Sequence, residues 1–276
     1  MNRLSIQEKT KILRALVEGC SIRSAERMTG HHRDTIMRLL VEAGKKAELV
    51  LNTEINDISL NHIQIDEAWT YVGKKNKQFK DEDIGDTKLG TQFVFVAMDR
   101  ETKLIPTFRL GKRDLSTVIP FINDLKEKIK GRTHITSDSY KPFTTAIIRA
   151  FGLKKVSYTQ LMKVYSSNGD PKREGYSPID FVTTRKRVMF GNPPWECIST
   201  SHIERQNLTL RMSLRRMTRL TNAFSKKFEN LKAALNLHFA YYNFVRIHKS
   251  LRMTPAMAAR ITGQIWSIED ILTYQN

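Results

Sequence analysis

The sequence predicts an α/β fold: a mixed sheet flanked by helices, preceded by a small module of three helices. Within the first fifty residues, apolar positions recur at helical spacing and glycines separate the runs. From about residue 61 onward, short apolar runs typical of strands alternate with helical patterns. We therefore expect an N-terminal module over 1–46, a linker over 47–60, a main domain over 61–260 and a tail over 261–276.

The composition indicates a partner that carries negative charge. The 276 residues include 46 Lys and Arg against 28 Asp and Glu, a formal net charge of +18 at pH 7. Such a charge favours a nucleic-acid partner over an acidic small molecule. The two cysteines, Cys20 and Cys197, are too few for a disulfide framework or a zinc ribbon. No signal peptide or membrane-spanning run is visible, so we expect a cytoplasmic protein without a membrane partner.

Three helices are expected at the N-terminus. Ser5 and Glu8 have the spacing of a capping box, which begins the first helix. Ser21 can cap the second helix and Gly30 ends it, while Gly44 is the expected end of the third. Three short helices with a glycine-containing turn before the third are typical of a helix-turn-helix module that binds DNA.

The third helix of such a module enters the major groove with its N-terminal residues forward. The candidates for DNA contact at this position are His31, His32, Arg33, Thr35 and Arg38. The two histidines are better explained as turn and cap residues than as metal ligands, because no cysteine or second histidine pair lies near. The alternative is a trihelical module that contacts protein or only stiffens the N-terminus.

Two carboxylates in the main domain lie on predicted strands. Asp66 comes directly after the alternating apolar residues Ile63 and Ile65, and Asp138 ends a short later strand. A carboxylate at a strand of the core is desolvated and therefore needs a cation. The structural alternative for Asp138 is an N-cap of the helix that Pro142 begins, and both roles can hold together.

A third carboxylate, Glu204, lies near the start of a predicted helix. Its spacing from Ser201 is that of a capping box, which is a purely structural alternative. On an ideal helix the residues near the side of Glu204 are Asn207, Arg211 and Arg215, with Arg219 beyond them. A separate apolar stripe comprises Ile203, Leu210, Leu214 and Met217. A carboxylate at the head of a row of arginines suits metal binding beside a DNA backbone, with a solvated basic face as the alternative for Arg219.

Residues 156–198 are expected to be an irregular basic insertion that holds DNA. Gly, Pro and Ser accumulate there, and its basic residues include Lys172, Arg173, Arg185, Lys186 and Arg187. Long irregular stretches inside compact domains are often functional.

Two strand carboxylates and one helix carboxylate could converge on Mg²⁺ or Mn²⁺, which prefer hard oxygen ligands. The set resembles the Asp-Asp-Glu (DDE) catalytic residues of the RNase H-like transposases. Two segments in particular are similar to the insertion-sequence-one transposase family: Ile65-Asp66-Glu67-x-Trp69-x-x-Val72-Gly73-Lys74-Lys75 and Ile203-Glu204-Arg205-x-Asn207-x-x-x-Arg211. The resemblance extends from Ile63 to about Ala258.

The resemblance implies an RNase H-like catalytic domain and a DNA transposase. Such an enzyme recognises the terminal inverted repeats of its own insertion sequence, cuts them and joins the 3′ ends to target DNA. Asp66, Asp138 and Glu204 would be the catalytic and metal-binding residues, with two Mg²⁺ or Mn²⁺ ions and no nucleotide cofactor. The implied partners are double-stranded transposon ends and target DNA, bound by a homo-oligomer at the bacterial nucleoid.

Two other functions remain open at this point. One is a non-catalytic helix-turn-helix regulator, or a decayed transposase whose DNA-binding module still works. The other is a metal-dependent nuclease of the same fold without joining activity.

Overall fold

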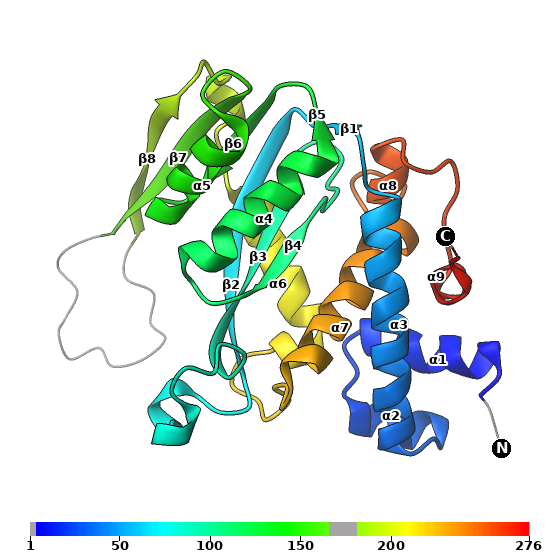
Figure 1. The fold of residues 1–276 in the computed structure, drawn as a ribbon. Helices are drawn as coiled ribbons and strands as arrows, with labels where there is room; N and C mark the ends of the chain where they lie inside the picture. The colour runs from blue at the N-terminus through cyan, green and yellow to red at the C-terminus, as the bar shows by residue number, and fades with distance from the viewer. Residues whose placement is uncertain (1–3, 166–180, 276) are drawn as a thin grey trace.

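The computed structural model describes residues 4–165 and 181–275. A six-stranded mixed sheet with the order β4-β3-β2-β6-β7-β8 forms its centre, and a group of N-terminal helices lies beside it (Figure 1). The strands are β2 (His62–Val72), β3 (Gly90–Asp99), β4 (Phe108–Gly111), β6 (Thr133–Ser137), β7 (Val156–Tyr165) and β8 (Phe181–Phe190). The sheet is parallel between β2, β6 and β7 and antiparallel elsewhere. The predicted α/β class, with a mixed sheet flanked by helices and an N-terminal helical region, is confirmed.

Helices cover both faces of this sheet. They are α4 (Leu115–Lys128) and α5 (Lys141–Phe151) on one face, and α6 (Ser201–Ser213) and α7 (Phe228–Ala240) on the other. Phe95 of β3 packs against Phe121 of α4 and Phe143 of α5, with ring centroids 6.0 and 6.1 Å away. Phe108 of β4 points to the opposite face, where its ring lies 4.4 Å from that of Phe239. The apolar core is thus built on both sides of β3 and β4.

The N-terminal helices are α1 (Ile6–Val17), α2 (Ile22–Thr29) and α3 (Arg33–Thr53). The predicted capping box of Ser5 and Glu8 is present, and Ser21 caps α2 as expected. Gly30 ends α2 in the left-handed region with φ 74°, a conformation that glycine adopts without steric cost. The first two helices and their turns are therefore confirmed.

The predicted end of the third helix at Gly44 is wrong. α3 continues to Thr53 and takes in about half of the predicted linker 47–60. Gly44 lies where α3 crosses α7, and a Cβ at this position would stand 2.5 Å from the Cα atom of Ala233. The missing side chain permits a close approach of two helices and does not stop the helix.

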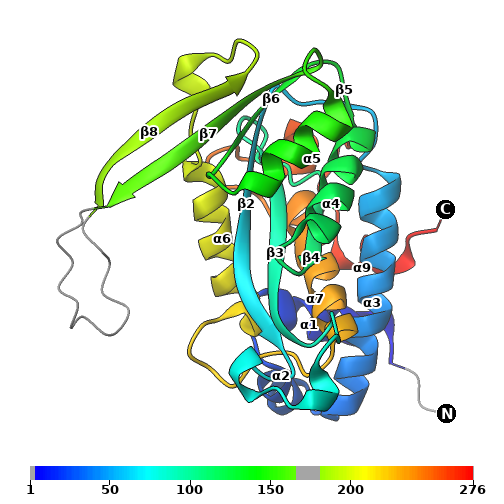
Figure 2. The same cartoon turned by 60° about the vertical axis from the view of Figure 1, so that its left-hand side comes forward.

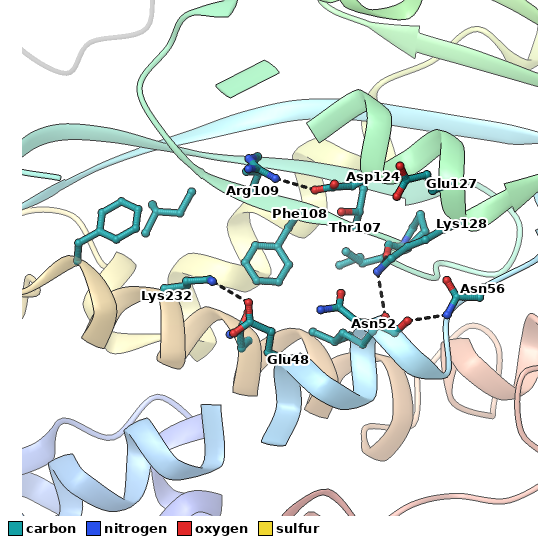
Figure 3. A pocket seen from close by; sticks show the side chains of 16 residues that line it. Glu48, Asn52, Asn56, Thr107, Phe108, Arg109, Asp124, Glu127, Lys128 and Lys232 are labelled. Atoms are coloured by element: carbon teal, nitrogen blue, oxygen red, sulfur yellow. Dashed lines mark hydrogen bonds and ion pairs between the residues drawn. The ribbon is translucent and has the colours of Figure 1, made fainter. Parts of the chain in front are cut away.

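Polar contacts also attach α3 to the sheet domain (Figure 3). The buried Lys128 donates from Nζ to the carbonyl oxygens of Leu51 on α3, at 2.9 Å, and of Pro106, at 3.1 Å. Burial lowers the pKa of Lys128 to about 8. Glu48 of α3 forms an ion pair of 2.7 Å with Lys232 of α7. The buried apolar residues of α3 and of the sheet belong to one continuous cluster, so the N-terminal helices share the core of the main domain.

The prediction of an irregular insertion over 156–198 is wrong for β7 and β8, whereas residues 191–198 contain only the short 3-10 turn Trp195–Cys197. β7 and β8 form a long antiparallel hairpin that reaches beyond the other strands (Figure 2). β7 pairs in parallel with β6 from Thr133↔Val156 to Ser137↔Gln160. The Gly and Pro residues that suggested an irregular stretch all lie outside these two strands, which are rich in β-branched and aromatic residues. Residues 166–180, which include Lys172 and Arg173, lie outside the described residues.

The C-terminal part closes the fold against α3. α7 is followed by the π-helical segment η5 (Tyr241–Val245), and Thr254 caps α8 (Pro255–Ala258). In the predicted tail, α9 (Ile268–Thr273) packs against α1 and α3. Within the described residues, no helix is both long and apolar enough to cross a lipid bilayer.

The close crossing of α3 and α7 predicts a strong effect of a single methyl group. Gly44→Ala should lower the free energy of unfolding by about 1–3 kcal/mol, because the new Cβ meets main-chain atoms that cannot move aside. Urea denaturation of both variants would measure the change. Gly263→Ala is the control, since nothing lies within 4 Å of its new Cβ. Equal stability of Gly44→Ala and the parent would contradict the packing role.

Candidate active site

Asp66 lies where β2 loses one of its two neighbours. β2 pairs with β3 from Ile63 to Val72, but with β6 only as far as Gln64↔Thr136. Asp66 and Asp138 each follow that last pair by two residues. Asp138 therefore lies just beyond the carboxyl end of β6, and Asp66 lies within β2 where the parallel pairing of the two strands stops. Binding sites in open α/β sheets form at the carboxyl ends of parallel strands.

A buried glutamine fixes the start of α6 on the same strand. Gln64 of β2 is 1% exposed, and its Oε1 accepts hydrogen bonds from the main-chain N–H groups of His202 (3.1 Å) and Ile203 (3.0 Å). These are otherwise unpaired donors of the first helical turn. Gln64 thus brings Glu204 to the strand that carries Asp66.

The three carboxylates predicted from the sequence line one open cleft of about 670 Å³. The other residues that line it are Arg113, Ser139, Tyr140, Lys141, Pro142, Leu161, Lys163 and Thr200. Asp138 and Glu204 both act on Asp66 electrostatically, since each raises its pKa. The structure therefore brings Asp66, Asp138 and Glu204 together from β2, the end of β6 and the start of α6.

The tightest group of oxygens includes a residue that the predicted set left out. One carboxylate oxygen each from Asp66, Glu67 and Asp138 lies within 4.8 Å of the others. The Glu67 side chain is only 7% exposed, and its Oε2 atom is buried without a hydrogen-bond partner among the described residues. An oxygen buried in this way lacks the partner that its desolvation requires. The donor set and this unpaired oxygen fit a hard divalent cation such as Mg²⁺ or Mn²⁺.

Two basic side chains compensate the acidic charge in the structure. Arg113 donates from Nε to Oε1 of Glu67 at 2.7 Å and lies 4.0 Å from Oδ2 of Asp138, with its guanidinium stacked on the Tyr140 ring. Lys163 of β7 lies 2.8 Å from Oε1 of Glu204. Sequence reasoning missed both residues, because neither the turn after β4 nor the irregular-looking stretch indicated a neighbour for the acids.

Each of the other two predicted carboxylates also has a local partner. The predicted N-cap role of Asp138 is wrong, because Tyr140 is the N-cap of α5. Oδ1 of Asp138 instead accepts the N–H of Tyr140 at 3.0 Å in the turn before this helix, while Oδ2 faces Arg113. The predicted capping box of Ser201 and Glu204 is wrong, because Thr200 is the N-cap of α6. Glu204 instead accepts a hydrogen bond of 2.6 Å from the Thr200 hydroxyl.

Burial changes the acid strength of two of these carboxyls. Burial raises the pKa of Asp66 to about 6, with Asp138 and Glu204 adding to the effect. Burial also raises the pKa of Glu67 to about 7, and the charges of Asp138 and Asp66 act in the same direction. Arg113 lowers the pKa of Glu67 and so offsets part of this increase.

The side of α6 predicted to face DNA contacts β2 at two positions. Asn207 donates from Nδ2 to Oδ2 of Asp66 at 2.8 Å, and Arg211 donates to the carbonyl oxygen of Trp69 at 3.3 Å. All four residues of the predicted apolar stripe are buried, but only Ile203 and Leu210 lie on α6. The expectation that Arg215 continues the helical row is wrong, because α6 ends at Ser213. Arg215 and Arg219 follow as exposed residues.

The N-terminal candidates occupy the first turns of α3. His32 is the N-cap, and its Nδ1 accepts the N–H of Asp34 at 3.3 Å, which confirms the predicted capping role. His32, Arg33 and Arg38 are exposed, and Thr35 is half-buried. These side chains form one accessible polar surface at the start of the helix.

The sequence matches no protein-family model and no curated protein.

The raised pKa of Glu67 predicts how stability depends on pH. In metal-free buffer the folded protein binds the Glu67 proton more tightly than the unfolded chain does. The contribution of this protonated carboxyl to the free energy of unfolding is therefore complete below about pH 4.5 and is lost as the pH rises through about 7. Between these two pH values, the free energy of unfolding should fall by roughly 1–3 kcal/mol less in Glu67→Gln than in the parent. Denaturation at several pH values would measure it.

The exposed Glu82→Gln is the control and should keep the parent's pH profile. If the free energy of unfolding of Glu67→Gln depended on pH as the parent's does, burial would not raise the pKa of this carboxyl.

Proposed function

We propose that the protein is a DDE transposase that cleaves the ends of its own insertion sequence and transfers the strands to target DNA. The observation that supports this most strongly is the single cleft shared by Asp66, Asp138 and Glu204, three residues chosen from distant stretches of the sequence. The net charge of +18 suits a polyanionic substrate.

The topology of the sheet supports an RNase H-like catalytic domain. That fold requires a hairpin followed by a crossover, with its second acidic residue at the end of a strand adjacent to the first. β2, β3 and β4 form the antiparallel part, and a crossover through α4 leads to β6, parallel to β2. Asp66 and Asp138 occupy the two positions.

Asp66, Asp138 and Glu204 would hold two divalent cations, and Glu67 adds a fourth carboxylate beside them. Bound Mg²⁺ would activate the attacking water or 3′-hydroxyl and stabilise the leaving oxygen. The protein's own residues orient this set: Asn207 holds Oδ2 of Asp66, and Thr200 holds Glu204. Arg113 limits the repulsion between Glu67 and Asp138.

The N-terminal helices would supply recognition of the DNA ends. A turn at Gly30 followed by the exposed start of α3 is consistent with a helix-turn-helix module whose third helix enters the major groove. Arg33 and Arg38 would contact the duplex there, and the exposed Arg215 and Arg219 would contact its backbone nearer the catalytic domain. Pairing two ends requires a homo-oligomer on the DNA.

Amide substitution of the carboxylates tests the catalytic proposal. Asp66→Asn, Asp138→Asn and Glu204→Gln should each lower Mg²⁺-dependent cleavage and joining by at least roughly a hundredfold, because each removes a charged ligand from the cleft. The substrate is a labelled duplex carrying the terminal repeat, incubated with Mg²⁺ or with EDTA. Affinity for that duplex should stay close to the parent's.

The exposed Asp81→Asn is the matched control and should keep the parent's rate. Near-normal strand transfer by any of the three cleft variants would refute the assignment. Specific binding without cleavage by the parent would instead indicate a non-catalytic DNA-binding protein, and cleavage without joining would indicate a nuclease.

A further inference from the structure

Beyond the acidic cleft, three aromatic rings lie side by side at the far end of β2. The ring centroids of Trp69 and Tyr71 are 5.7 Å apart, and Tyr71 lies 4.5 Å from Phe224 with the ring planes tilted by 33°. A parallel bridge between Val72 and Ser225 sets the last pair side by side. All three rings are half-buried, so each keeps some surface accessible to solvent.

The rings line a hollow of about 310 Å³ that carries positive charge. Its basic residues are Lys75, Arg211, Arg216 and Arg219, and none of the described residues that line it is acidic. Lys75 lies 5.7 Å from the Tyr71 ring centroid and Lys226 lies 3.8 Å from that of Phe224. Accessible aromatic rings beside cationic side chains match the chemistry of single-stranded nucleic acid, whose bases stack and whose phosphates are anionic.

A strained, exposed leucine lies at the rim of the same hollow. Leu220 is 83% exposed and has a φ of 56°, a left-handed conformation that is uncommon for residues other than glycine. It follows Arg219 directly in the segment between α6 and α7. Exposed apolar side chains beside basic residues are used by DNA-binding proteins as wedges between base steps.

We infer that this hollow, the aromatic hollow, binds an unpaired nucleobase of the DNA substrate while Leu220 fills the gap left in the base stack. The base stacks on Tyr71 and Phe224, and the adjoining phosphates contact Arg219 and Lys75. The inference rests on the proposed function, which supplies the DNA.

The aromatic hollow and the acidic cluster lie along the same strand. Alternation puts Trp69 and Tyr71 on the face of β2 that Glu67 takes, opposite Asp66, and β6 leaves this edge of β2 unpaired beyond Gln64. Trp69 and Tyr71 lie three and five residues beyond Asp66 on the same strand, or roughly 10 and 17 Å at about 3.3 Å per residue. At about 3.4 Å per nucleotide, the unpaired base would lie roughly three to five steps from the scissile phosphate.

Binding of single-stranded DNA in EDTA tests the aromatic hollow without any cleavage. Fluorescence anisotropy with a labelled oligonucleotide of about 20 thymidines should show an affinity loss of about tenfold for Tyr71→Ala and for Phe224→Ala. The slope of affinity against salt should stay unchanged, because no charge is removed. Tyr274→Ala, a half-buried tyrosine beyond α9, is the control and should bind like the parent.

A second arm uses a duplex with 2-aminopurine placed at successive positions. Binding of the parent should unstack the base at one position, so that 2-aminopurine placed there changes its fluorescence. With Leu220→Gly this change should be smaller by at least half. Glycine keeps the left-handed backbone, so a folding defect is not expected. Leu153→Gly, at another exposed leucine, should behave like the parent.

Parent-like single-strand affinity in both aromatic variants, or the same 2-aminopurine signal in Leu220→Gly, would overturn the inference. If Mg²⁺-dependent cleavage persisted alongside either result, the proposed function would stand and only the aromatic hollow would be rejected. Absence of any DNA binding by the parent would reject both.

Discussion

The cost of holding several carboxylates out of water in one place is the constraint on which this site depends. Asp66, Glu67 and Asp138 approach one another at the point where β2 and β6 cease to pair. Arg113 offsets part of the repulsion, and burial still raises the pKa values of Asp66 and Glu67. A protein tolerates such an arrangement where a cation completes it, and divalent metal is the cation that oxygen ligands favour.

The surrounding structure is arranged to hold that cluster in place. Gln64 anchors the first turn of α6 on β2, Asn207 reaches Asp66 one helical turn after Glu204, and Arg211 reaches the main chain of β2 one turn later. The close crossing of α3 and α7 at Gly44 ties the N-terminal helices to the same core. In the proposed function, the end-recognition surface and the cleft are therefore parts of one rigid framework.

Local sequence patterns predicted the three cleft carboxylates because Asp66 follows alternating apolar residues on a strand, Asp138 follows a short strand and Glu204 lies in the first turn of a helix. Glu67 could not be predicted in this way, because the alternation of a strand places its side chain on the face opposite Asp66. Both side chains approach Asp138 only because β6 leaves the edge of β2 unpaired beyond Gln64. Arg113 and Lys163 required knowledge of tertiary neighbours. The Gly44 error has the same origin, since a glycine that ends a helix and one that admits a second helix look alike in sequence.

The location of bound metal tests the central claim most directly. Crystals of the full chain soaked in Mn²⁺ and measured for anomalous scattering should show an ion bound by carboxylate oxygens of both Asp66 and Asp138. Glu204 should be released from Lys163 when it joins the set. Saturation with Mn²⁺ that leaves no anomalous peak between the two aspartates, with Glu204 still paired to Lys163, would contradict the proposed catalytic site.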